Sequence, residues 1–181
     1  MRTALKFLLL IFLTTSLTSC EKIKGWFNEE IDTNLEGQMN IVSDVDELKS
    51  TEDYSINGTA TIDITDNDDL ADYADLIEDI KVKDVSLYVL GIDSSDVVIK
   101  AGSTFTISTP SNPGMSWPIN QDWPIMQGTS VDLTADNYSV LNDMLEGKEE
   151  VTLTSKGSCN KGNVHITMTY DIHVVVEANP L

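Results

Sequence analysis

The densest group of potential metal ligands in this chain is an aspartate-rich stretch, Asp63-Ile64-Thr65-Asp66-Asn67-Asp68-Asp69. Carboxylate and amide oxygens are the ligands that Ca²⁺ prefers, and the EF-hand supplies them at alternate positions, with a glycine at the turn and a glutamate at the end. The stretch begins in this way, but Leu70 and Ala71 interrupt the spacing. We therefore expect it to cap a helix and form a solvated acidic turn, with no metal assigned and calcium binding left as the open alternative.

The chain has two histidines, His165 and His173, on the polar face of one predicted strand. At about 3.4 Å per residue, eight residues separate them by more than about 25 Å, which excludes a metal shared within one chain. No HExxH motif, nucleophile elbow or phosphate-binding glycine loop occurs. The sequence therefore predicts two exposed strand histidines, no catalytic residue and no cofactor.

The aromatic segment Trp117-Pro118-Ile119-Asn120-Gln121-Asp122-Trp123-Pro124 contains two Trp-Pro pairs. Exposed indole faces beside Asn120 would stack on a sugar ring or on apolar groups of a partner. Trp117, Asn120 and Trp123 are therefore the candidate ligand-binding residues. The competing interpretation, which the usual burial of tryptophan favours, is that both indoles cover one end of the domain.

The first twenty residues have the form of an exported leader. Residues 1–6 carry two positive charges, residues 7–13 are apolar, and Leu17-Thr18-Ser19-Cys20 closes the segment. This is the organisation of a secretory signal peptide, and the apolar run is shorter than the roughly 20 residues that cross a bilayer. The segment resembles a bacterial lipoprotein signal peptide with its lipobox. That resemblance implies cleavage between Ser19 and Cys20 and fatty acyl chains, palmitate among them, on Cys20.

Charge narrows the range of partners. The chain has 30 acidic and 11 basic residues, a net charge of −19. Arg2 and Lys6 are the charged residues that removal of residues 1–19 takes away, so the mature chain is more acidic still. Such a surface repels phosphate backbones, which excludes nucleic acid as the expected partner. It also repels anionic lipid, so the acyl chains alone would anchor the protein. Cys159 has no cysteine other than Cys20 with which to pair.

Alternation of polar and apolar residues predicts strands along most of the chain. In the clearest one, from Val164 to Val176, every second residue is apolar. We expect it to form a hairpin with Glu150–Ser155. Two helices are predicted by apolar spacing, over 67–79 and 136–145, and a proline-rich loop over 111–128. The further strands are expected over 59–64, 82–90, 96–101, 103–109 and 130–133.

These elements predict a mostly β fold, an antiparallel β-sandwich, Ig-like or related, with two short helical insertions. The expected organisation is a signal peptide (1–19), a tether (20–36) and a β-sandwich domain (37–181). With its lipobox, alternating strands and ending Val174–Leu181, the chain resembles small Bacteroidetes-type lipoproteins with β-sandwich bodies, a resemblance that brings no assigned activity.

The expected function is that of a non-enzymatic binding or structural accessory module of the cell envelope. Its lipid anchor would hold it on the outer membrane, on the periplasmic or the outward face, with a glycan or an envelope protein as partner. The alternative is a carbohydrate- or adhesin-type binding protein that uses the Trp117–Trp123 loop.

Overall fold

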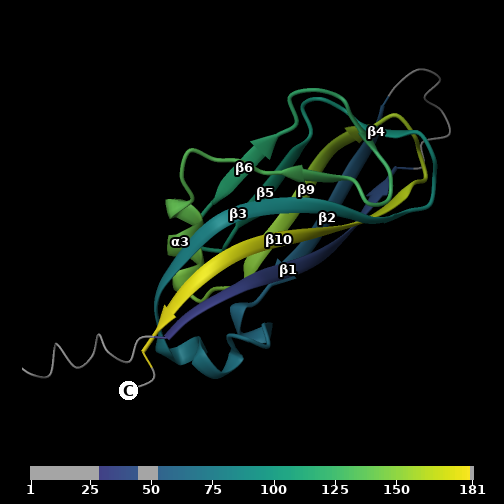
Figure 1. Ribbon diagram of the computed structural model, residues 1–181. Helices are drawn as coiled ribbons and strands as arrows, with labels where there is room; N and C mark the ends of the chain where they lie inside the picture. Colours follow the sequence, from purple (N-terminus) through teal and green to yellow (C-terminus); the bar gives the residue numbers. More distant parts are fainter. Residues whose placement is uncertain (1–28, 45–52, 180–181) are drawn as a thin grey trace, which may run out of the picture.

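The computed structural model describes residues 29–44 and 53–179 (Figure 1). The predicted leader and Cys20 lie outside these residues. The described chain forms strands β1 (Glu29–Ser43), β2 (Tyr54–Ile62), β3 (Ile77–Ile92), β4 (Val97–Ile99), β5 (Thr104–Ser108), β6 (Met115–Pro118), β7 (Trp123–Ile125), β8 (Ser130–Asp132), β9 (Val151–Cys159) and β10 (His165–Ala178), the 3-10 segments η1 (Ile64–Asp66) and η2 (Ala71–Leu76), and the helix α3 (Ser139–Glu146).

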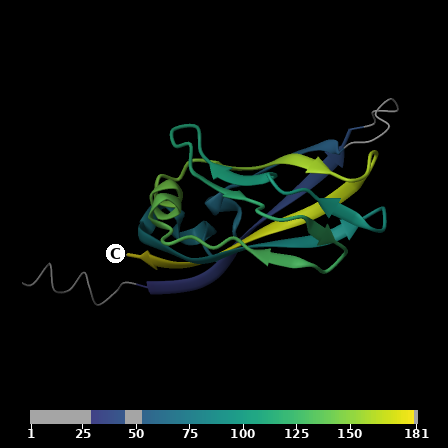
Figure 2. The same ribbon diagram turned by 90° about the horizontal axis from the view of Figure 1, so that it is seen from above.

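The strands form one antiparallel sheet that curls over into a sandwich. Their order is β6-β5-β9-β2-β1-β10-β3-β8, and the short pair β4–β7 joins the sheet beside β9. β1, β10, β3 and β8 make one layer, and β2, β9, β5 and β6 make the other (Figures 1 and 2). The prediction of a mostly β, antiparallel sandwich is confirmed.

β10 is the central strand of its layer. It pairs with β1 from Glu29↔Ala178 to Val42↔His165, and with β3 on its other side. Its even-numbered residues face the core as predicted, and Met168 and Tyr170 are completely buried. The Tyr170 hydroxyl has no hydrogen-bond partner among the described residues, and burial raises its pKa. The inner faces of both layers share one hydrophobic core.

The predicted hairpin between Glu150–Ser155 and β10 is wrong. β9 does begin at Val151, but it pairs with β2 and β5 in the opposite layer, and β10 pairs with β1 and β3. The connection after Cys159 therefore crosses between the two layers. Alternation identified both strands, whereas their partners depend on the curl of the sheet.

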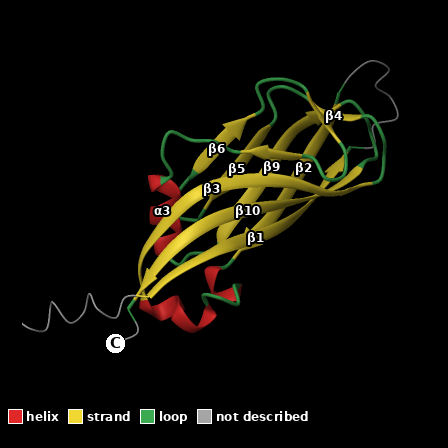
Figure 3. Cartoon of the chain, in the orientation of Figure 1, coloured by secondary structure: helices red, strands yellow, loops and turns green. Residues whose placement is uncertain are grey.

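The predicted helix over 67–79 is also wrong. Only the 3-10 segments η1 and η2 occur there, and β3 begins at Ile77 (Figure 3). The Asp63 side chain accepts a hydrogen bond from Thr65 N (2.8 Å), and Asn67 Oδ1 accepts one from Asp69 N (3.0 Å). Such short polar side chains compete with the helical backbone for hydrogen bonds and favour turns.

Helix α3 covers an edge of β3 that β8 leaves free, because β8 pairs only with Ser86–Tyr88. Asn142 Oδ1 accepts from Val82 N (2.9 Å), and Glu146 Oε1 accepts from Ile80 N (3.2 Å). One turn of helix thus satisfies two strand donors that would otherwise form an exposed edge. The predicted second helix is confirmed, although it begins at Ser139 and not at Asp136.

Two more boundaries differ from the prediction. The tether was expected to reach Glu36, but β1 already begins at Glu29, so the body of the domain starts closer to Cys20. The proline-rich segment 111–128 was expected to be a loop, but it contains the short strands β6 and β7. Proline is tolerated in both because each is a short strand near a sheet margin.

Candidate functional site

The two tryptophans of the candidate ligand loop do not form a shared exposed face. Trp117 retains 8% exposure, and its Nε1 donates to Thr134 O (3.1 Å), which ties the β6 margin to the segment after β8. Trp123 is half-buried and packs edge-on against Phe105, with ring centroids 6.3 Å apart. Asn120 is exposed beside them. Trp117 therefore offers too little surface for a sugar to stack on, as expected of a tryptophan that covers one end of the sandwich.

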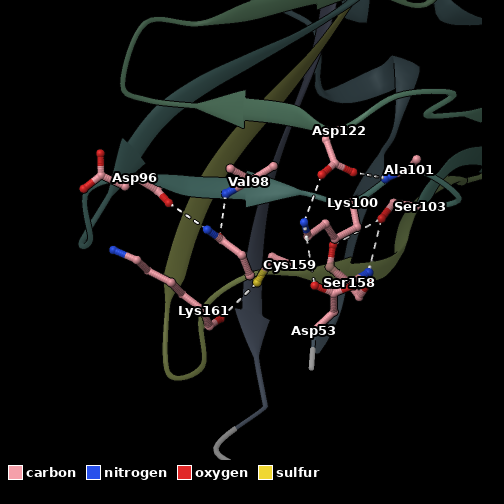
Figure 4. Close-up of polar contacts among 11 residues, drawn as sticks. Asp53, Asp96, Val98, Lys100, Ala101, Ser103, Asp122, Ser158, Cys159 and Lys161 are labelled. Carbon is pink, nitrogen blue, oxygen red and sulfur yellow. Dashed lines mark hydrogen bonds and ion pairs between the residues drawn. The ribbon is translucent and has the colours of Figure 1, made fainter. Parts of the chain in front are cut away.

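Asp122, the charged residue of that loop, also makes contacts within the fold (Figure 4). Asp122 Oδ2 accepts from Lys100 Nζ (2.9 Å), and its Oδ1 accepts from Ala101 N (3.1 Å). The Lys100 ammonium holds the pKa of Asp122 below its usual value, and the carboxylate raises the pKa of Lys100. Asp122 thus fastens the loop to the turn after β4.

Cys159 ends β9 beside the same network (Figure 4). It is completely buried, its Sγ donates to Lys161 O (3.0 Å), and burial raises its pKa. A buried thiol with a raised pKa is a poor nucleophile, because the thiolate is the reactive form. The neighbouring Asn160 accepts from Val98 N (2.7 Å) and donates to Asp96 O (2.9 Å), which fixes the connection between the layers.

The histidines lie on the outer face of β10, as predicted, but each has aspartate partners that the sequence did not reveal. His165 Nδ1 is 2.9 Å from Asp93 Oδ2. His173 lies between two strands: its Nε2 is 2.7 Å from Asp32 Oδ1 on β1, and its Nδ1 is 3.1 Å from Asp84 Oδ2 on β3. Only the doubly protonated imidazolium can donate to both carboxylates at once.

The two carboxylates raise the pKa of His173 above 6.5 through hydrogen bonds first and charge second. The same face carries Asp171, whose pKa is raised by burial and by the charges of Glu36 and Asp84. The contacts of His173 therefore join β1, β10 and β3 most strongly when its ring is charged.

We expect the stability difference between the wild type and a His173→Gln variant to depend on pH. Because the folded-state pKa of His173 is raised, its contribution is fully present below the unfolded pKa and is lost as the pH rises through the folded value. His173 and its two carboxylate partners are partly exposed, so the full contribution is expected to be about 1 kcal/mol or less. Urea unfolding on both sides of this pH window measures it, with His165→Gln as the control for an exposed histidine. A pH-independent difference would contradict the prediction.

A different feature places the aspartate-rich stretch beside a break in the sheet. β1 pairs with β2 only from Asn40↔Thr59 to Ser43↔Ile56. From Met39 toward the start of β1 the two strands diverge. A cleft of about 580 Å³ lies between residues 32–36 of β1, residues 61–63 at the end of β2, and residues 66–69. We call this opening, formed by residues 32–36, 61–63 and 66–69, the β1–β2 fork.

Gly37 stands where the strands part. A Cβ on this residue would lie 2.5 Å from Leu153 Cδ1 and 2.6 Å from Ile62 Cγ1. The missing side chain lets residues of the opposite layer pack directly against the β1 backbone, while β1 itself continues along β10. The fork is therefore built into the packing of the core.

The acidic turn contacts β1 at the mouth of the fork through two side chains. Thr33 Oγ1 donates to Asp69 Oδ2 (2.7 Å), and Asn67 Nδ2 donates to Asn34 O (2.9 Å). Within residues 29–44 and 53–179, no three carboxylate, histidine or cysteine side chains are placed to hold a metal ion. The arrangement is suited to recognition of cationic or hydrogen-bonding groups, and sequence alone could not place β1 beside the turn.

Comparisons with known proteins identify no family. No protein-family model and no curated protein matches the chain. Among solved structures it is similar to a decameric BFDV capsid protein (8% identity, TM-score 0.41, covering 82% of this chain and 99% of that chain). It is also similar to a chain of the Desmodium yellow mottle tymovirus structure (12% identity, TM-score 0.34, covering 84% of each chain). Likeness at this level carries no argument about function. None of the helices in the described residues has the length and apolarity to cross a membrane.

Proposed function

We propose that this protein is a lipid-anchored, non-enzymatic binding or structural accessory module of the bacterial cell envelope, held on the periplasmic or outward face of the outer membrane. The observation that carries the proposal is the lipobox Leu17-Thr18-Ser19-Cys20 after a short apolar run. More than one acyl chain on Cys20 would suffice for stable anchoring, since a single chain binds only marginally.

The position of β1 supports a body that stands close to the bilayer. Eight residues lie between Cys20 and Glu29, the first residue of β1, and the connection spans at most about 30 Å when fully extended. Because Glu29 pairs with Ala178, this end of the sandwich would face the membrane. The β3–β4 and β9–β10 connections, at the other end of the long strands, would point away from it (Figure 1).

The candidate reactive side chains outside the fork have structural roles, which supports a binding function over a catalytic one. His173 and Asp122 form contacts between elements of the fold, and Cys159 is buried. The fork is instead an accessible cleft lined by carboxylates and strand edges, which is the kind of surface that recognises another molecule.

A Cys20→Ala variant is expected to move from the membrane fraction to the soluble fraction, because it has no sulfur for the acyl chains. Fractionation of the producing cells and intact mass measurement of the purified protein check this result. The matched control is Cys159→Ala, which removes the other cysteine and is expected to leave the protein in the membrane fraction. Membrane association of Cys20→Ala at the wild-type level, or an unmodified Cys20 in the wild type, would overturn the proposed anchor.

A further inference from the structure

The β1–β2 fork presents two strand edges that face each other without a strand between them. Within the described residues, positions 32–36 of β1 pair with β10 alone, and positions 61–62 of β2 pair with β9 alone. Unpaired strand edges are ready templates for another extended chain, and natural proteins usually block them. Here a cleft of about 580 Å³ separates the two edges.

The turn 63–69 contacts β1 through two hydrogen bonds at the exposed surface, Thr33–Asp69 and Asn67–Asn34. The turn itself is anchored by Ile64, which is buried in the core. A typical hydrogen bond contributes only about 0.5–1.5 kcal/mol net. An incoming strand can replace these contacts with backbone hydrogen bonds of its own.

The chemistry of the walls determines the occupant. The cleft is lined by six carboxylates and by no lysine, arginine or histidine, and the six are Asp32, Glu36, Asp63, Asp66, Asp68 and Asp69. Its lining also includes Leu35 and Ile62, which are almost fully buried. An extended segment that alternates basic with small apolar residues matches both features, because its successive side chains point to opposite sides.

We propose that the fork binds an extended, lysine- or arginine-containing segment of another protein by strand addition between β1 and β2. Backbone hydrogen bonds to the two edges supply the affinity, and the carboxylates select for basic side chains. A second copy of this chain is a poor occupant, because its net charge is −19. This inference names the partner class for the proposed function, and it rests on the proposed binding role and not on the lipid anchor.

The test uses the full chain carrying Cys20→Ala and two fluorescein-labelled peptides of alternating lysine and valine. One peptide has an ordinary backbone. The other is N-methylated along its backbone, so it keeps every charge but cannot donate to a strand edge. Fluorescence anisotropy is expected to show binding of the first peptide and at least about tenfold weaker binding of the second, because strand addition depends on main-chain hydrogen bonds.

Two sets of variants locate the site. Asp68→Asn with Glu36→Gln is expected to weaken binding several-fold, whereas the same charge change at the exposed residues Asp143 and Glu150 is expected to leave it unchanged. Thr33→Cys with Asp69→Cys replaces the side chains whose oxygens are 2.7 Å apart. Oxidation of this pair is expected to close the fork and abolish binding, and reduction is expected to restore it.

Equal binding of the two peptides would overturn the proposal, because charge attraction alone would then explain it. Failure of both peptides to bind would overturn it as well. So would a calorimetric titration that shows calcium binding by a protein that binds neither peptide. These outcomes are independent of the lipid anchor. Peptide binding by a protein whose wild type keeps an unmodified Cys20 would refute the anchor and leave the fork intact.

Discussion

A Phe105→Ala variant is expected to lose about 3–5 kcal/mol of unfolding free energy, the range for removing a large buried ring from a core. Phe105 is completely buried on β5. Its ring meets Tyr170 of the opposite layer edge-on at 6.4 Å between centroids, and Trp123 of β7 at 6.3 Å. One side chain therefore connects both layers of the sandwich and the aromatic loop.

Urea unfolding followed by circular dichroism measures this loss. Because the whole stability of a domain is about 5–15 kcal/mol, the variant is expected to lose a large fraction of its stability. The control is Tyr88→Ala, which truncates an aromatic residue that is 39% exposed and is expected to change stability by about 0.5 kcal/mol or less. Equal stabilities of the two variants would show that Phe105 does not join the layers.

A Gly114→Ala variant is expected to cost about 2–5 kcal/mol, from backbone strain and a steric clash together. Gly114 has a φ of 71°, and a Cβ on it would lie 1.7 Å from Ile107 O. That oxygen belongs to β5, whose residue Ile107 pairs with Met115 of β6. Since the clash is with backbone, relief requires β5 and β6 to move apart.

The matched control for Gly114 is Gly102. It has a φ of 91°, and no atom lies within 4 Å of a Cβ built on it. Gly102→Ala is therefore expected to cost only the backbone strain, about 1–2 kcal/mol. Thermal unfolding of both variants separates strain from collision, and a Gly114→Ala variant no less stable than Gly102→Ala would contradict the close approach of β6 to β5.

Periodicity in the sequence predicted the elements with a buried face well. The alternation from Val164 to Val176 identified β10, and the pattern around Leu141 identified α3. It failed at 67–79 because Ile80 fits two periods. Ile80 lies at helical spacing from Leu70 and Ile77, yet with Val82 it begins the buried alternation of β3, whose β-branched residues suit a strand.

The candidate site was less accessible to prediction, because it depends on which strands become neighbours. Parity placed His173 on the polar face, but nothing near it in sequence indicates Asp32 or Asp84, which come from the strands on either side. The fork depends on where β1 leaves β2, and the packing against Gly37 determines that point. The residues carry no local signal for either arrangement.

The pairing of β10 has a consequence for the order in which this protein can be made. β1 is the first described strand and β10 the last, and β10 lies between β1 and β3 along almost its whole length. The layer therefore cannot close until β10 has been synthesised, and contacts this distant in sequence form slowly. A nascent chain of this topology leaves β1 and β3 without their common neighbour until translation has passed residue 178.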